Sequence, residues 1–102
     1  MAKLKVELKG EGIIDNAAIY LEDEAEKLPH FLDPKNDKEW LKENISIPLE
    51  GELDYSLYVV AFSGTKFKCT ISDEEENKIE LSGVTGSKTK NRAHLKGSKK
   101  LK

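Results

Sequence analysis

The chain has 102 residues, of which 37% are hydrophobic and 35% are charged, and its formal net charge is −2. A chain of this length is expected to form one domain that buries roughly two-thirds of its unfolded surface. Its single cysteine, Cys69, excludes an internal disulfide and a Cys-x-x-Cys motif for zinc or redox chemistry. No apolar run reaches membrane-spanning length or resembles the core of a signal peptide, so we expect a cytoplasmic protein with no membrane partner.

Three segments in the first half of the chain are predicted strands. The first and third alternate apolar and polar residues, as strands with one buried face do, and the second places Ala17, Ile19 and Leu21 on one face and Ala18 and Tyr20 on the other. The three segments cover residues 3–9, 13–22 and 45–49.

The long connection between the second and third of these segments has a different character. Residues 21–44 are polar, contain Pro29 and Pro34, and show little alternation. Proline is tolerated just inside the start of a helix but not in its interior. We therefore predict one short helix over residues 37–44. Because so short a helix is marginal in water, packing of Trp40 must hold it, and we expect it to cover one face of the central strand that follows.

The stretch from Leu53 to Ser72 is predicted to form a hairpin of two neighbouring strands. Its turn falls at residues 63–65, where Gly64 can adopt the positive φ that tight turns require. The first strand is apolar on both faces, which is typical of a central strand. The second strand alternates, so its polar face should meet solvent.

Tyr58, Val60 and Phe62 share the second apolar face of that first strand. If the short helix covers them, they belong to the core; if not, they form an exposed patch of the kind that sheet proteins use as an interface. The core interpretation is favoured because large residues on a central strand usually find cover. These three residues are nevertheless the best candidates for a contact surface.

Two more strands are predicted after the hairpin, over residues 78–82 and 91–96. Six to seven short strands with one helical excursion indicate a mostly-β fold, either a small antiparallel β-sandwich or a barrel. Residues 1–97 would form this single domain, and residues 98–102 a basic, disordered tail.

Positive charge is concentrated near the C-terminus. Residues 1–85 carry ten Lys and Arg against nineteen Asp and Glu, whereas residues 86–102 carry seven cations and no carboxylate. Such a segment either only solvates the C-terminus, which is as common as any contact role, or contacts an acidic protein, another copy of this chain included. Nucleic acid is an unfavourable partner, because the acidic body repels it and no aromatic residue follows Phe67 to stack bases. The cations predicted to take part in contacts are Lys88, Lys90, Arg92 and Lys96.

Two acidic clusters offer an alternative chemistry. If both lay at one end of a sandwich, their oxygen atoms could bind a calcium ion. Neither cluster has the Asp-x-Asp spacing or the glycine of a dedicated calcium loop, so solvated charge is the favoured interpretation and no cofactor is predicted. The candidate ligands are Glu22, Asp23, Glu24, Asp73, Glu74 and Glu75.

Catalytic groups are sparse. His30 and His94 are the only histidines, neither is spaced for zinc binding, and a Gly-x-Ser-x-Gly motif is absent. The sequence therefore predicts a non-catalytic domain that binds a protein partner or itself, as a subunit or adaptor in an assembly. A calcium- or small-ligand-binding sandwich is the runner-up, and a nucleic-acid accessory protein follows it.

Overall fold

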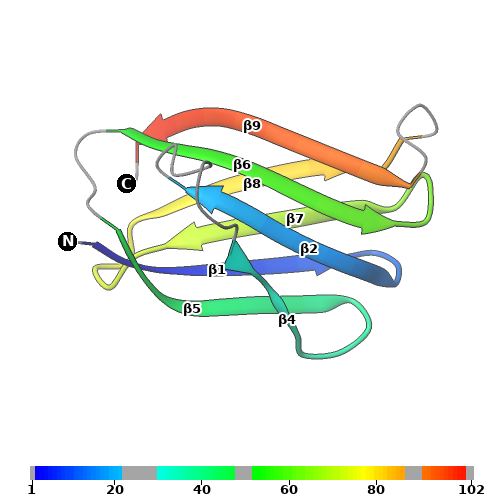
Figure 1. The fold of residues 1–102 in the computed structure, drawn as a ribbon, viewed down its shortest axis with the longest axis horizontal. Coiled ribbons are helices and arrows are strands. Elements are labelled where there is room, and N and C mark those ends of the chain that lie inside the picture. The colour runs from blue at the N-terminus through cyan, green and yellow to red at the C-terminus, as the bar shows by residue number, and fades with distance from the viewer. Residues whose placement is uncertain (1, 22–29, 48–51, 87–90, 101–102) are drawn as a thin grey trace.

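The computed structural model describes residues 2–21, 30–47, 52–86 and 91–100, which form two packed antiparallel sheets (Figure 1). In spatial order, sheet A contains β4 (Asp33–Pro34), β5 (Glu39–Ile47), β1 (Ala2–Gly10), β7 (Lys66–Ser72) and β8 (Lys78–Val84). Sheet B contains β3 (His30–Phe31), β2 (Ile14–Leu21), β6 (Glu52–Ala61) and β9 (Arg92–Lys100). The predicted mostly-β sandwich is confirmed, and its two additional strands are the two-residue β3 and β4.

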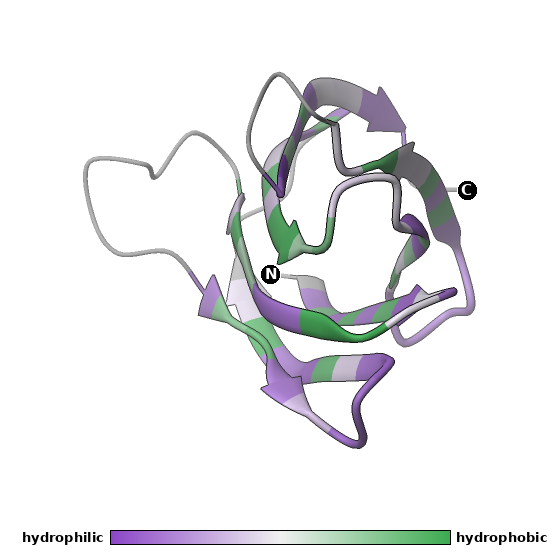
Figure 2. Ribbon diagram, turned by 90° about the vertical axis from the view of Figure 1, so that its right-hand side faces the viewer, coloured by the Kyte–Doolittle hydropathy of each residue, from purple (hydrophilic) through white to green (hydrophobic). Residues whose placement is uncertain are grey.

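The core lies between the two sheets and is built by alternation along the strands, which an irregularity after Ile14 interrupts in β2 (Figure 2). Val6 and Ile71 of sheet A and Ile19 and Leu57 of sheet B are fully buried, whereas their immediate neighbours are less so. Each such side chain stabilises the fold by about 1.5–3 kcal/mol through loss of contact with water. The described part of the chain contains no helix, and hence none long and apolar enough to cross a membrane.

The predicted hairpin over Leu53 to Ser72 is wrong, because its two strands belong to different sheets. β6 pairs with β2 and β9, whereas β7 pairs with β1 and β8. The turn between them does contain Gly64 at a φ of 85°, as the sequence indicates, but it forms a corner between the layers. Alternation shows which face of a strand is buried. It does not show whether the next strand pairs with it in the same sheet or packs against it from the opposite sheet. The sequence pattern therefore could not distinguish a hairpin from a corner.

The predicted helix over residues 37–44 is also wrong, because β4 and β5 form a hairpin there. The side-chain oxygen of Asn36 accepts hydrogen bonds from the backbone N–H groups of Lys38 and Glu39, at 2.9 and 3.0 Å, and so closes the turn. Trp40 then lies opposite Leu8 of β1 and packs, partly buried, against the core. Pairing with β1 satisfies the backbone more fully than an isolated two-turn helix would.

Strand β9 extends further than the sequence indicates. Residues 98–100, predicted as part of a disordered tail, pair instead with the first residues of β6. The hydroxyl of Ser98 donates a hydrogen bond to the carboxylate of Asp54, which lies opposite it on β6. Opposite charges on directly opposed strand residues, Lys100 and Glu52, also favour this pairing. Residues 101 and 102 lie outside the described part of the chain.

The sandwich is closed differently along its two sides. On one side, β3 and β4 follow each other in the chain, and Leu32 between them is buried in the core. Its backbone N–H donates a 3.0 Å hydrogen bond to the carbonyl of Ala17. On the other side, a single bridge joins Gly86, two residues after the end of β8, to Arg92 of β9, and no ladder of the described residues pairs β8 with β9.

Candidate functional site

The outer face of sheet B carries three aromatic side chains from three adjacent strands, which we call the aromatic cluster: Tyr20, Tyr58 and His94. The rings of Tyr58 and His94 stack with centroids 4.1 Å apart and an interplanar angle of 10°. Tyr20 meets Tyr58 edge to face, with centroids 5.9 Å apart. Such pairs contribute about 0.5–1.5 kcal/mol beyond their burial, so the cluster is a preformed surface rather than three independent side chains.

Alternation along β6 explains why Tyr58 faces outward. Leu57 and Val59 point into the core, so the intervening residues must point away from it. The first strand of the expected hairpin is indeed central in its sheet, but no described segment covers its second face. Tyr58 is 42% exposed and Phe62 is 71% exposed, which corrects the favoured interpretation that they are core residues.

Hydrogen bonding orients the ring of His94. Its Nε2 atom lies 2.6 Å from the hydroxyl oxygen of Ser56, on the neighbouring strand β6. Because His94 is directly opposite Tyr58 in the β6–β9 pairing, this contact holds the imidazole over the phenol ring. The cluster is therefore held by sheet register, by stacking and by one polar contact.

Two cations flank the aromatic cluster. Arg92 lies opposite Val60 and Lys96 lies opposite Ser56, and both cations are exposed. Four of the predicted contact residues, Tyr58, Val60, Arg92 and Lys96, thus share one face. Phe62 is separate from them, at the corner after β6. Lys88 and Lys90 lie outside the described residues.

A hollow of about 450 Å³ lies beside the cluster on the same face. Six of its lining residues are Tyr20, Asp54, Ser56, Tyr58, His94 and Lys96. Sequence reasoning missed Tyr20 and His94 as site residues. Both fall on outward positions of predicted strands, but only the register of β2 and β9 against β6 shows that they meet at Tyr58.

The apolar part of this face continues toward the opposite edge of sheet B. Ala18 lies between Tyr58 of β6 and Phe31 of β3 in the strand pairing. Phe31 is 57% exposed, and the small side chain of Ala18 leaves both rings accessible. An aromatic band therefore crosses the sheet from β3 to β9.

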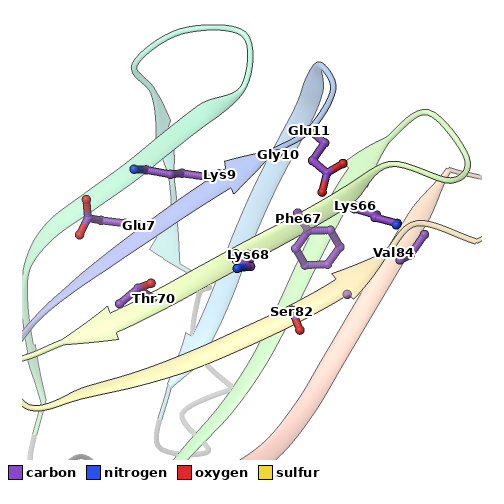
Figure 3. Close-up of a pocket in the computed structure, with 11 residues that line it drawn as sticks. Glu7, Lys9, Gly10, Glu11, Lys66, Phe67, Lys68, Thr70, Ser82 and Val84 are labelled. Atoms are coloured by element: carbon purple, nitrogen blue, oxygen red, sulfur yellow. The ribbon is translucent and has the colours of Figure 1, made fainter.

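Sheet A bears a larger hollow, of about 520 Å³, with a different character (Figure 3). Lys9 and Lys68 are directly opposed there, and Lys66 lies nearby on β7. Glu7 and Glu11 line the same hollow, so its charges are mixed. Opposite charges are thus interspersed around this hollow, and Val84 is its exposed aliphatic residue.

In the acidic turn after β7, the carboxylate of Asp73 is hydrogen-bonded within the turn itself. The Asp73 carboxylate accepts hydrogen bonds from the backbone N–H groups of Glu75 and Asn77, both at 2.9 Å, and from the Asn77 side chain at 3.1 Å. Desolvation alone would raise the pKa of Asp73, but these hydrogen bonds hold the pKa below its usual value. The carboxylate therefore shapes the turn.

Metal ligands do not converge in the part of the chain that the structure describes. Within it, no group of three or more His, Cys, Asp or Glu side chains is placed to hold a metal ion. Glu74 and Glu75 are exposed in the turn with Asp73. The other proposed calcium ligands, Glu22, Asp23 and Glu24, lie outside the described residues.

Two titratable side chains away from the face have perturbed acidities. Burial lowers the pKa of His30, and the positive charge of Lys42 lowers it further. Burial raises the pKa of the Cys69 thiol to about 12, with the Glu7 carboxylate adding to the effect. Cys69 is thus an un-ionised core residue at neutral pH, without the thiolate that a nucleophile needs.

Comparison with known proteins adds no family relationship. No protein-family model, no curated protein and no solved structure matches this chain.

Proposed function

We propose that the chain is a non-catalytic protein-interaction domain of the cytoplasm, which binds a protein partner through the outer face of sheet B. The observation that carries this proposal is the exposed aromatic cluster with Arg92 beside it. Tyrosine and arginine are the residue types that most often dominate binding energy at interfaces. Because the Tyr58 ring is already packed between Tyr20 and His94, it loses little side-chain entropy when a partner covers it.

Charge suggests the character of the partner. Arg92 and Lys96 stand at the β9 side of the face, and acidic groups on a partner would meet them there. Charges at the rim of an interface mainly speed association and set orientation, whereas the aromatic centre contributes affinity. We therefore propose an acidic partner surface with an apolar centre. A second copy of the chain, itself acidic over residues 1–85, is one protein of this kind.

Single-stranded nucleic acid is a second candidate ligand for the same face. Sequence reasoning argued against it because no aromatic residue follows Phe67, but the pairing of β6 with β9 brings Tyr58 beside Arg92 and Lys96. Aromatic rings flanked by cations favour base stacking. Asp54 in the adjacent hollow and the overall negative charge still favour a protein partner.

A calcium-dependent function has less support, since the Asp73 carboxylate accepts hydrogen bonds within its own turn.

The test compares three forms of the protein: wild type, Tyr58→Ala, and the matched control Lys68→Glu on sheet A. Cross-linked partners from the native host should be lost with Tyr58→Ala and retained with Lys68→Glu.

Light scattering at low and high salt shows whether the partner is a second copy. If labelled oligothymidylate binds and Tyr58→Ala abolishes its binding, the face is a nucleic-acid site. If Tyr58→Ala leaves every cross-linked partner in place, the proposed function is wrong.

A further inference from the structure

Strand β9 is the edge strand of sheet B. It pairs with β6 from Lys100 opposite Glu52 to Arg92 opposite Val60. On its other side, the described residues provide only the bridge from Arg92 to Gly86. Beyond that bridge, the β9 backbone faces the similarly placed edge strand β8, which pairs with β7 alone among the described strands. A strand edge of this length is a template for pairing with another chain.

A groove lies between the two edges. It has a volume of about 400 Å³, and Leu81 of β8 and Leu95 of β9 line it together with Tyr55. The absence of a side chain at Gly97 lets Tyr55 reach the β9 edge, because a Cβ atom there would lie 2.9 Å from the Tyr55 hydroxyl oxygen. The groove therefore offers apolar contacts directly beside an open backbone edge.

The charges around this edge are strongly one-sided. β9 carries Arg92, Lys96, Lys99 and Lys100 and no carboxylate. Across the groove, the Glu80 carboxylate of β8 lies 3.9 Å from the ammonium group of Lys78. Lysines on an edge discourage pairing with neutral or basic strands, which is their common protective role. The same lysines attract a strand whose side chains are acidic.

We propose that β9 and the groove beside it bind an extended acidic segment of a protein partner by strand addition. The segment's backbone would hydrogen-bond to the edge of β9 beyond Arg92, with which no other described strand pairs. Alternate side chains of an added strand point to opposite faces. Its acidic side chains would therefore lie beside Arg92 and Lys96 on the outer face, while its apolar side chains would enter the groove against Leu81 and Leu95. This inference rests on the proposed function and names the chemistry of the partner.

The experiment uses the full chain and a fluorescent synthetic peptide in which glutamate and valine alternate. Binding is measured by fluorescence anisotropy. Two control peptides separate the contributions: one replaces glutamate by lysine, and the other is N-methylated at alternate amides so that one backbone edge cannot donate. The lysine peptide should bind at least about tenfold more weakly, because its charge has the same sign as that of β9. The N-methylated peptide should also lose about tenfold or more, since it gives up at least two hydrogen bonds and a factor of ten corresponds to about 1.4 kcal/mol.

Matched charge variants locate the site on the protein. Lys96→Glu combined with Lys99→Glu on β9 should weaken peptide binding by about tenfold or more. Lys66→Glu combined with Lys68→Glu makes the same change in net charge on sheet A and should have little effect. All four lysines are exposed, so both double variants should keep the wild-type melting temperature.

Three results would overturn strand addition at β9: equal binding of the N-methylated peptide, equal weakening by the two double variants, or no binding of the glutamate–valine peptide at about 1 mM. A stable dimer that excludes the peptide and is lost in the β9 double variant would assign the edge to a second copy instead. Tyr58→Ala distinguishes the two proposals, because its effect on cross-linked partners tests the aromatic face, whereas the N-methylated peptide tests the edge.

Discussion

The hydroxyl oxygen of Thr85 accepts a 3.0 Å hydrogen bond from the backbone N–H of Thr65, which joins the end of β8 to the corner between the sheets. The same hydroxyl donates to the carbonyl of Phe62, and the backbone N–H of Thr85 donates to the carbonyl of Thr65 at 3.0 Å. Thr85 is fully buried, so its own hydroxyl and N–H have no access to water as an alternative partner. Thr85 therefore fastens the corner.

Replacing Thr85 by valine should destabilise the fold substantially. The change keeps the shape of the side chain but leaves the Thr65 N–H and the Phe62 carbonyl without this partner. The Thr65 N–H and the Phe62 carbonyl keep a 3.1 Å hydrogen bond to each other, so the cost is that of the two hydrogen bonds lost with the Thr85 hydroxyl. At about 1 kcal/mol each, we expect a loss of about 2 kcal/mol in urea denaturation. Thr65→Val is the control, because the more accessible Thr65 hydroxyl should contribute about 1 kcal/mol or less. Equal losses in the two variants would contradict this role.

Gly97→Ala should destabilise the protein through Tyr55. A Cβ atom at position 97 would lie 2.9 Å from the Tyr55 hydroxyl oxygen and 3.2 Å from its Cζ atom. Overpacking of this kind costs about 1–3 kcal/mol. Tyr55→Phe removes the nearest atom, so the double variant should be more stable than the sum of the single changes predicts. Strict additivity in a double-mutant cycle would rule out this contact.

Thiol chemistry at Cys69 should report global unfolding. Since burial raises the pKa of this thiol to about 12, the native protein holds almost no thiolate at neutral pH. We expect a thiol reagent to modify the folded chain only as fast as the chain opens, and the urea-unfolded chain at the rate of an ordinary cysteine. Equal rates for the folded and unfolded chain would show that Cys69 is accessible.

His30 should make stability depend on pH on the acid side of neutrality. Its pKa in the folded protein is below the ordinary value of 6.5, so the unfolded chain binds more protons between the two values. The stability associated with neutral His30 is fully present above pH 6.5 and is lost as the pH falls through the folded pKa. His30→Gln should flatten this part of the curve of unfolding free energy against pH. An unchanged slope would assign the titration to other groups.

The sequence was sufficient for much of the fold but for little of its connectivity. Alternation along residues 53–61 correctly places Leu57 and Tyr58 on opposite faces, because side-chain direction in a strand is a local property. Whether another segment covers the Tyr58 face is not local, and the expected cover is wrong. Which strands are neighbours is a non-local property. The pattern around Gly64 therefore predicts a hairpin, where the structure has a corner between the two sheets. Likewise, β5 forms because β1 is available for pairing, which no local pattern in residues 39–47 reveals.

In the candidate site, too, local features could be predicted and strand pairing could not. Tyr58, Val60, Arg92 and Lys96 could be chosen from composition and alternation, and the structure places them on one face. The stacking of His94 on Tyr58 depends on the register between strands 38 residues apart, as the contact from Ser56 to His94 shows. Nothing local encodes that register, so the aromatic cluster as a unit could not be predicted.

The corner at residues 62–65 is one of several crossings between the sheets, and these crossings determine how the protein can be divided into fragments. The chain moves from one sheet to the other after β1, β3, β5, β6 and β8, so neither layer is made of one continuous segment. Cutting the chain anywhere within β5 to β8 would take strands from both layers at once. Most native contacts therefore close long loops before they stabilise anything, which is typical of slow, all-or-none folding. A fragment produced by a cut within β5 to β8 should accordingly not fold on its own, since it lacks strands of both layers.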